Sequence, residues 1–409
     1  MAEAHDQLAD TVRIEGARVL ATLVRTVGSL SVAEDAVQDA VLAALRDWPR
    51  TGVPDEPRAW LTVTARRKAI DILRRESARA TKERDGSVLM DPGTADLPPA
   101  GVVRDDQLRL IFTCCHPALA PDARVALALR TLCGLSTAQV AAVLLTTEAA
   151  MAKRLTRTRN KITVARIPYT VPSDADLPGR LGAVCGVVHA LYTAGHAPLA
   201  GATALDVDVC VEAVRLGRLL VDLLPDEPMP AAVLALILLT EARQPARIDD
   251  AGDVVLLADQ DRSQWDATAI AEGCALLTAS LRRTAGVADP YQLQASIAAE
   301  HARAPSYEQT DWTEIVRLYD LLLSVAPTPA AALSRAVALS EEYGAVAGLA
   351  ALETVTPGPR WHAVRSELLA REGRYAEAAA EATASLAGEL SAPERRYRER
   401  RRDTWLAER

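Results

Sequence analysis

The chain has 409 residues, of which 49% are hydrophobic and 24% charged. This composition indicates a globular protein of about two to four domains and excludes a disordered or collagen-like chain. The net charge of −8 is unevenly divided, because residues 1–168 hold 24 Lys and Arg against 20 Asp and Glu, whereas residues 169–409 hold 22 against 34. The basic front part suggests a polyanionic ligand, although two solvated surfaces of a single fold would also explain it.

Three further features bear on where the protein works. No apolar run approaches the roughly 18 residues of a membrane helix, and the acidic start MAEAHDQLAD does not resemble a secretory signal. The six cysteines are dispersed, which favours a reducing compartment over a disulfide framework. We therefore expect a cytoplasmic protein with no contact to a membrane.

Helix-forming alanine and leucine dominate nearly every segment, so the sequence predicts an all-α fold. Breaks rich in proline and glycine fall at residues 48–57, 85–101, 167–179 and 356–360. The best strand-like pattern, at 253–257, is too isolated to predict a sheet. The breaks predict two small helical domains followed by a long helical domain.

A cluster of polar residues opens the helix predicted at residues 33–48. The cluster consists of Glu34, Asp35, Gln38 and Asp39. Acidic residues in a first turn often only complement the helix dipole, but they would equally serve as a face for docking another protein. Their apolar neighbours Val37, Val41 and Leu45 are expected to turn to the core.

The helix predicted at residues 57–76 is strongly basic. Its cations include Arg66, Arg67, Lys68, Arg74 and Arg75, and Trp60 lies near its start. A basic helix beside an aromatic residue can bind single-stranded nucleic acid, with cations along the backbone and unstacked bases in pockets. Packing in the core is the stronger expectation for the Trp60 ring itself.

The sharpest pattern lies at residues 135–166, where two short amphipathic helices follow one another closely. Ser136 and Thr147 are good N-caps for these helices, and Met151, Leu155 and Ile162 form the apolar face of the second. This spacing predicts a helix-turn-helix. Because the second helix also carries five cations, it is predicted to bind DNA through its N-terminal turn and basic side chains.

The last part of the chain is predicted to form two pairs of helices. The first pair is 329–340 with 345–352, and the second is 361–371 with 375–387. The second pair resembles a tetratricopeptide repeat, with Gly373, Tyr375 and Ala378 at fitting positions. A stack of such pairs is the predicted architecture of the C-terminal domain.

Several groups of polar residues could suggest a catalytic or metal site, but their spacing and the motifs around them argue against one. Cys114, Cys115 and His116 are adjacent, whereas zinc ligands are normally spaced, so they are expected to pack in a core. The DQDRSQWD segment lacks the glycine and distal glutamate of a calcium loop. His189, Tyr192 and His196 have no accompanying catalytic motif. We expect no catalytic residue, no metal site and no cofactor.

In this order, the segments AEDAVQDAVLAALRDW, PRAWLTVTARRKAIDILRRE and the helix-turn-helix resemble bacterial RNA polymerase sigma factors of the extracytoplasmic-function (ECF) type. The C-terminal segments, among them RLIFTCCHPAL and LLPDEPMPAAVLALILL, resemble the subgroup with a tetratricopeptide-like extension. The resemblance implies sigma region 2 at 8–84, a linker at 85–105, region 4 at 106–168, a linker at 169–179 and the extension at 180–409. Departures from the family pattern are Arg67, where asparagine is usual, and Leu145, where glycine is usual.

The resemblance also implies a role for each set of side chains. The set expected to read the −35 promoter element consists of Thr147, Glu148, Ala150, Lys153, Arg154 and Arg157. The set expected to melt and read the −10 element consists of Trp60, Arg66, Arg67, Lys68, Arg74 and Arg75. The set expected to dock on core RNA polymerase consists of Glu34, Asp35, Gln38 and Asp39.

The implied function is a transcription initiation factor, not an enzyme, whose partners are core RNA polymerase and promoter DNA. A regulatory protein or small ligand is the expected partner of the extension, whose effect on transcription stays open. The alternative is a helical-repeat scaffold or ligand-binding protein whose front half binds nucleic acid without specificity.

Overall fold

The computed structural model describes residues 2–81, 106, 109–132, 135–144, 146–167, 169–170, 172, 176–197, 205–387 and 390–408. Within these residues the chain is helical apart from turns and one isolated β-bridge between Ile248 and Val254. The predicted all-α fold is therefore confirmed. The predicted linker at 85–101 lies outside the described residues.

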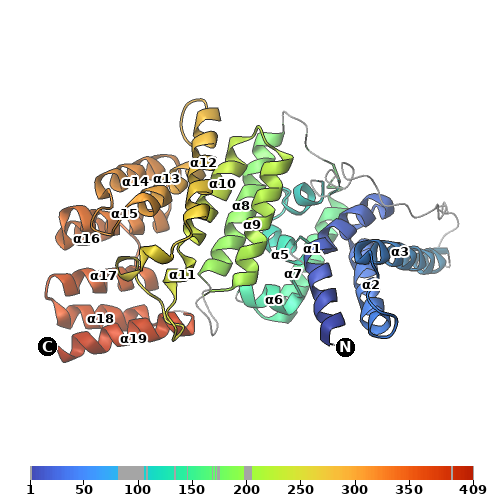
Figure 1. Ribbon diagram of the computed structural model, residues 1–409, viewed down its shortest axis with the longest axis horizontal. Helices are drawn as coiled ribbons and strands as arrows, with labels where there is room; N and C mark the ends of the chain where they lie inside the picture. Colours follow the sequence, from blue (N-terminus) through green and yellow to red (C-terminus); the bar gives the residue numbers. More distant parts are fainter. Residues whose placement is uncertain are drawn as a thin grey trace. The chain divides into compact units, whose positions relative to one another are not determined.

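The chain divides into two compact units, Met1–Val187 and Val188–Arg409 (Figure 1). Both predicted small domains lie in the first unit. The helix α8 (Leu177–His196) crosses the division, so its first half belongs to one unit and its second half to the other.

The first unit begins with three helices that pack against one another, α1 (Ala2–Val27), α2 (Leu30–Thr51) and α3 (Pro57–Thr81). Ser29 caps α2, since its hydroxyl accepts a hydrogen bond from the backbone N–H of Val32. The buried face of α2 is made mostly of alanines, which let the neighbouring helices approach closely. Gly52 ends α2 with a φ of 83°, which favours glycine.

The rest of the first unit holds a helical segment at 109–114 and the helices α5 (Pro121–Thr131), α6 (Thr137–Val143) and α7 (Glu148–Val164). Buried apolar side chains of 110–112 and α5 form its core. The first half of α8 joins this core, where Arg180 donates a hydrogen bond to the carbonyl of Phe112 at 3.0 Å.

The second unit starts with α9 (Val207–Leu223), α10 (Pro228–Glu241) and the short α11 (Gln244–Arg247). Residues 230–239 of α10 are all buried. A helix that is apolar all round must lie inside a protein, and α10 packs against α9, α12 (Ala267–Arg283) and α13 (Pro290–Arg303). Two single turns of 3₁₀-helix, η1 (Leu257–Asp259) and η2 (Arg262–Gln264), precede α12.

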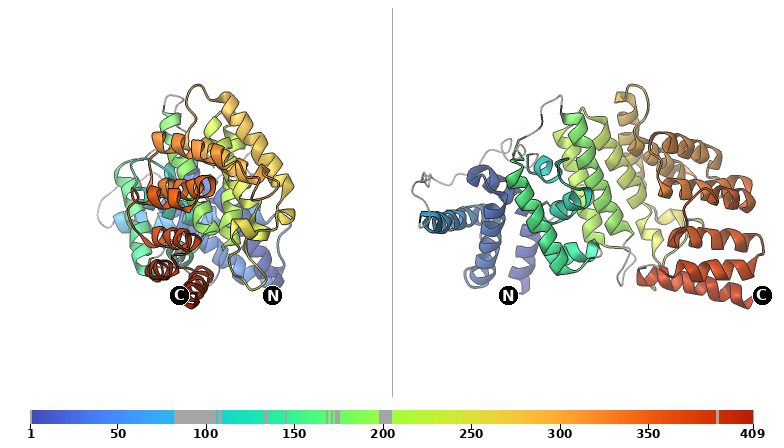
Figure 2. Two further views of the ribbon diagram at one scale, coloured as in Figure 1. Left: turned by 90° about the vertical axis from the view of Figure 1, so that its left-hand side faces the viewer. Right: turned by 180° about the vertical axis from the view of Figure 1, so that it is seen from behind.

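From α14 onward the helices follow one another as a stack of neighbours (Figures 1 and 2). They are α14 (Trp312–Val325), α15 (Pro329–Tyr343), α16 (Ala345–Leu352), α17 (Pro359–Arg371), α18 (Tyr375–Ser385) and α19 (Ala392–Ala407). The two helix pairs predicted from the sequence are confirmed as α15–α16 and α17–α18. Gly373, with a φ of 70°, lies in the turn between α17 and α18.

Aspartates cap four of the α-helices that the structure describes in the second unit. The side chain of Asp266 accepts hydrogen bonds from the first N–H groups of α12, and Asp289 forms a reciprocal capping box with Gln292 on α13. Asp206 and Asp311 cap α9 and α14. In the DQDRSQWD segment the carboxylates of Asp261 and Asp266 accept hydrogen bonds from backbone N–H groups, which is a structural role.

Candidate nucleic-acid and partner interfaces

The helix-turn-helix is present as predicted. The hydroxyl of Thr147 accepts a hydrogen bond from the N–H of Ala150 at 3.2 Å and so starts α7. Met151, Leu155 and Ile162 are buried along one face of α7, as their spacing predicted. Because those residues hold α7 to its own domain, the opposite face and the first turn remain available to a ligand.

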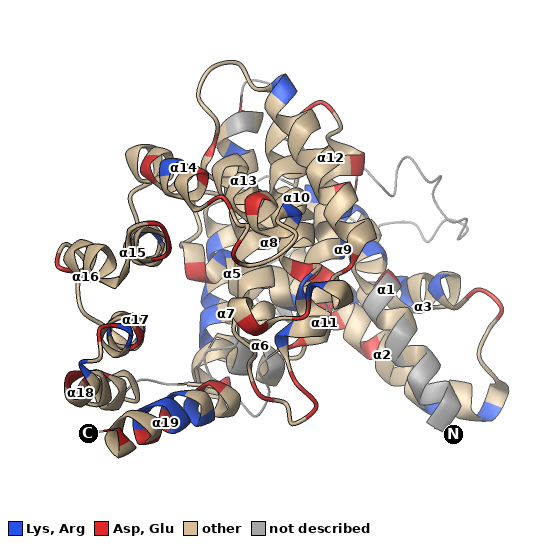
Figure 3. Cartoon of the chain, turned by 60° about the vertical axis from the view of Figure 1, so that its left-hand side comes forward, with Lys and Arg blue, Asp and Glu red and all other residues tan. Residues whose placement is uncertain are grey.

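The predicted base-reading side chains lie on that outward face. Thr147, Glu148, Ala150, Lys153 and Arg157 are exposed, and Arg154 is half-buried. Seen from the side in Figure 3, Lys and Arg lie along α7. An exposed N-terminal turn followed by cations is the arrangement with which a recognition helix meets base edges and phosphates.

A second basic surface lies on α3. Arg67, Arg74 and Arg75 are exposed, whereas Arg66 and Lys68 are half-buried. Leu61, Ala65 and Ala69 are buried on the opposite side of the helix, so packing fixes the direction in which the cations point. This surface can follow a nucleic-acid backbone.

Trp60 is half-buried at the start of α3. Its ring meets that of the buried Trp48 edge-on, with 5.6 Å between ring centroids. This contact agrees with the expectation that Trp60 packs in the core, and it leaves only part of the ring open to a base.

The polar cluster at the start of α2 is split by the fold. Asp35 and Gln38 are exposed and Asp39 is half-buried, but Glu34 is buried. Glu34 accepts hydrogen bonds from the Thr131 hydroxyl of α5 at 3.1 Å and from the Arg159 guanidinium of α7 at 2.5 Å. The structure therefore separates Glu34 from the other three residues and pairs it with the helix-turn-helix domain.

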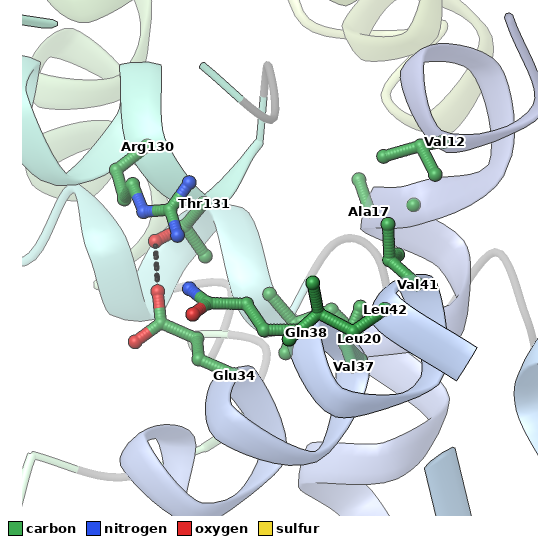
Figure 4. Close-up of a pocket in the computed structure, with 11 residues that line it drawn as sticks. Val12, Ala17, Leu20, Glu34, Val37, Gln38, Val41, Leu42, Arg130 and Thr131 are labelled. Carbon is green, nitrogen blue, oxygen red and sulfur yellow. Dashed lines mark hydrogen bonds between the residues drawn. The ribbon is translucent and has the colours of Figure 1, made fainter. Parts of the chain in front are cut away.

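The apolar side of the same cluster lines a cavity of about 330 Å³ (Figure 4). Val37, Val41 and Leu42 of α2 form one wall, side chains of α1 form another, and Arg130 and Thr131 of α5 close the side next to Glu34. The expectation that Leu45 turns to the core is wrong, since this side chain is 39% exposed. The core-facing positions are taken by alanines instead, which leaves α2 with an accessible apolar surface.

A buried polar contact that the sequence did not reveal joins the two small domains. Asp106, fully buried, forms ion pairs with Arg25 at 2.8 Å and Arg109 at 3.5 Å. The Tyr169 hydroxyl lies 2.9 Å from the carbonyl oxygens of both Ala21 and Asp106. Burial and the nearby Asp106 carboxylate raise the Tyr169 pKa, so this phenol stays neutral. Such a contact between distant segments has no local sequence signal.

The groups that suggested a metal site are explained by packing. Cys114 and Cys115 are buried as predicted, and burial raises the pKa of the Cys115 thiol to about 12. Among the described residues no three His, Cys, Asp or Glu side chains are grouped to hold a metal ion. Nor does any described helix have the length and apolarity to span a membrane.

Comparison with known families identifies the parts of the chain. Residues 12–79 match the model for sigma-70 region 2, and residues 109–162 match that for sigma-70 region 4. Residues 180–281 match a family of unknown function, DUF6596. The two sigma matches contain α2, α3 and the helix-turn-helix, where the structure places the exposed basic surfaces.

The relatives of the chain include an uncharacterised protein and two sigma factors. An uncharacterised protein of Rhizobium meliloti (strain 1021) is 41% identical over 88% of this chain and 87% of its own length. The probable ECF RNA polymerase sigma factor SigI of Mycobacterium tuberculosis is 30% identical over 41% of this chain and 58% of its own length. The ECF RNA polymerase sigma factor SigJ of the same organism is 35% identical over 37% of this chain and 48% of its own length. No solved structure matches the chain.

Proposed function

Because the chain belongs to the sigma-70 family as an ECF-type RNA polymerase sigma factor with a helical C-terminal extension, we propose which of its surfaces perform each step of promoter recognition. The observation that carries the proposal is the outward face of α7, which presents a capped, exposed N-terminal turn followed by cations. Core RNA polymerase and promoter DNA are the partners.

We propose that α7 lies in the major groove of the −35 element. Glu148 in its first turn is placed to accept a hydrogen bond from a cytosine amino group, and Arg154 and Arg157 to contact phosphate or guanine. Thr147 and Ala150 lie beside Glu148 at the tip of the helix, and Lys153 lies one turn further on. Losing a base contact should relax the sequence preference at one position, whereas losing a phosphate contact should weaken binding to all promoters.

We propose that α3 and the loop before it capture the unpaired −10 element. The cations Arg66, Arg67, Lys68, Arg74 and Arg75 would follow the non-template strand, and the open side of Trp60 would border the base pocket. Arg67 replaces the usual asparagine of the family, so the base preference here should differ from that of most ECF factors.

We propose that the exposed side of α2 docks on core polymerase. Asp35, Gln38 and Asp39 supply polar contacts, and Val37 and Val41 in the adjacent cavity supply an apolar one. Glu34 can join this surface only after it leaves Arg159 and Thr131. Docking through Glu34 would therefore compete with a contact inside the first unit, whereas docking through the other residues of α2 would not.

The test is the affinity of the full chain for purified core polymerase. Charge reversal in the double variant Asp35→Arg, Asp39→Arg should weaken binding about tenfold or more without unfolding the protein, because surface charges at an interface tune association. The control is Asp47→Arg, an exposed acid further along the same helix. Equal affinity of the double variant and the control would refute α2 as the docking surface.

We also propose that the chain catalyses no covalent step itself and works in the cytoplasm. The chemistry of RNA synthesis belongs to the polymerase, and both proposed partners reside in that compartment. The family is generally one of non-enzymatic regulators.

A further inference from the structure

A cavity in the second unit, outside every surface described above, has the size of a small-molecule site. It has a volume of about 490 Å³ and lies between α11, the segment after it, α15 and the helices α17–α19. Pockets for small ligands typically measure about 300–1,000 Å³. Five arginines and two glutamates line it, so its wall is strongly cationic.

Both glutamates of the wall are neutralised by arginines of α19. Arg401 donates two hydrogen bonds to the carboxylate of Glu367, at 3.0 and 2.6 Å, and the Tyr397 hydroxyl adds a third at 3.0 Å. Arg398 pairs with Glu394 at 2.5 Å. A third arginine of the wall, Arg371, pairs with Glu341 at 2.7 Å. These pairs leave two arginines of the wall to be accounted for.

The two remaining arginines are Arg247 at the end of α11 and Arg360 in the first turn of α17. Arg247 donates a hydrogen bond to the backbone carbonyl of His196 and forms no ion pair with any residue that the structure describes. Burial lowers the Arg247 pKa, and the charges of Glu241 and Glu394 oppose this shift. Arg360 is exposed, and its side chain forms no hydrogen bond or ion pair within the described part of the chain.

A half-buried guanidinium that lacks a carboxylate is costly unless an anion neutralises it. The remaining wall is apolar, formed by side chains such as Leu256, Leu333, Val337 and Val364. The wall therefore combines a hydrocarbon surface with the half-buried Arg247 and the exposed Arg360, neither of which forms an ion pair with a described residue. A neutral apolar molecule would leave the cations unpaired, and a bare inorganic ion would leave the apolar surface empty.

We propose that this cavity binds a small organic anion with an apolar body, whose carboxylate or phosphate group is held by Arg247 and Arg360. The site makes the extension a ligand-binding domain. The inference does not depend on promoter recognition, because none of the residues involved belongs to the sigma regions.

The test is isothermal titration of the full chain with three probes that share one hydrocarbon chain, namely sodium octanoate, n-octyl phosphate and 1-octanol. At least one of the two anions should bind saturably at one site and about tenfold or more tightly than the alcohol, because charge-assisted hydrogen bonds are strong. The tighter of the two anions identifies the preferred head group. Equal binding of all three probes, or no saturable binding of either anion, would overturn the proposal.

Two variants assign the binding to this cavity. Arg360→Gln should weaken binding of the preferred anion roughly tenfold. The fold should be unaffected, because Arg360 is exposed and its side chain has no partner among the described residues. Arg247→Gln should have a similar effect if circular dichroism shows that it folds. The matched control is Arg317→Gln, an exposed arginine on α14 that pairs with Glu314 outside the cavity. Unchanged affinity in Arg360→Gln would place the anion elsewhere and refute the site.

Discussion

Glu34 is a buried carboxylate whose two partners come from the helix-turn-helix domain. It is 7% exposed and accepts hydrogen bonds from Thr131 and Arg159. A buried acid held by an arginine and a hydroxyl is well satisfied, and removing its charge leaves Arg159 without its partner. The neighbouring Asp35 is exposed to solvent, so the stability of the fold does not depend on its charge.

This contrast predicts the effect of neutralising each residue. Glu34→Gln should lower the free energy of unfolding of the first unit by about 1.5–3 kcal/mol, the usual contribution of a hydrogen bond to a charged group. Asp35→Asn should change it by less than about 0.5 kcal/mol. Urea denaturation of both variants checks the prediction, and a Glu34→Gln variant as stable as Asp35→Asn would contradict the described pairing.

Two histidines of the second unit are held neutral by burial. Burial and nearby arginines lower the pKa of His196 to about 3 and that of His301 to about 4. Nδ1 of His196 lies 3.0 Å from the Tyr192 hydroxyl, which donates to Glu241 at 2.9 Å, so Nδ1–H of neutral His196 is the donor. His301 meets Trp312 edge-on, with 5.3 Å between centroids.

The lowered pKa values predict acid sensitivity of the second unit. The unfolded histidine binds a proton below about pH 6.5 and the buried one does not, so stability is fully present above pH 6.5 and falls as the pH drops towards 4. The loss should be up to about 3 kcal/mol for His301. His301→Phe should show a flatter stability curve between pH 6.5 and 4.5 in urea denaturation. A parallel curve for the two proteins would show that His301 does not titrate as described.

At the scale of elements, the packing of α16 depends on a glycine. A Cβ atom at Gly348 would lie 2.6 Å from Cβ of Ser340 on α15 and 2.9 Å from Cδ1 of Leu368 on α17. Real side chains do not approach so closely, so the three helices can meet here only without a side chain. At Gly182 in α8, by contrast, a Cβ atom would have no neighbour within 4 Å.

The two glycines therefore predict opposite effects of one substitution. Gly348→Ala should destabilise the second unit by about 1–3 kcal/mol through overpacking. Gly182→Ala should be neutral or stabilise the first unit by about 0.5–1 kcal/mol, because alanine favours the helix. Thermal unfolding of the two variants measures both effects. A Gly348→Ala variant with unchanged stability would contradict the close approach of α15, α16 and α17.

The elements themselves could be predicted from the sequence more fully than their contacts. The Thr147 cap and the spacing of Met151, Leu155 and Ile162 were sufficient to predict α7, because caps and helical periodicity are local signals. Leu45 looked like a core residue by the same criterion, but its side chain is exposed. The neighbouring helices cover the alanines of α2 instead. The burial of Glu34 depends on α5 and α7, which lie about a hundred residues away in the sequence. The sequence around Glu34 therefore carries no signal of this burial.

At the scale of the whole molecule, α8 is one continuous helix whose first half belongs to the first unit and whose second half belongs to the second. Arg180 in its first half contacts Phe112 in the first unit, and Val188, Leu191 and Tyr192 in its second half are buried. Removing the extension would expose those apolar side chains and weaken the helix that supports region 4.

We therefore expect the extension to be required for full activity. A chain ending at His196 should fold less stably and support less transcription with core polymerase than the full chain, since part of its α8 would lose its cover. The measurement is run-off transcription at equal concentrations of the two proteins. Transcription by the shortened chain at or above the full-length level would overturn the requirement and favour autoinhibition by the extension.

The central claim is that α7 and α3 direct core polymerase to specific promoters. The most direct measurement is transcription in vitro of fragmented genomic DNA from the source organism by core polymerase with the full chain, with the 5′ ends of the transcripts sequenced. The start sites should be preceded by two shared sequence elements at a fixed spacing. The double variant Arg154→Ala, Arg157→Ala should reduce the dependence of transcription on the upstream element and leave the dependence on the downstream element unchanged. Start sites that share no element, or that match those of core polymerase without the protein, would contradict this claim.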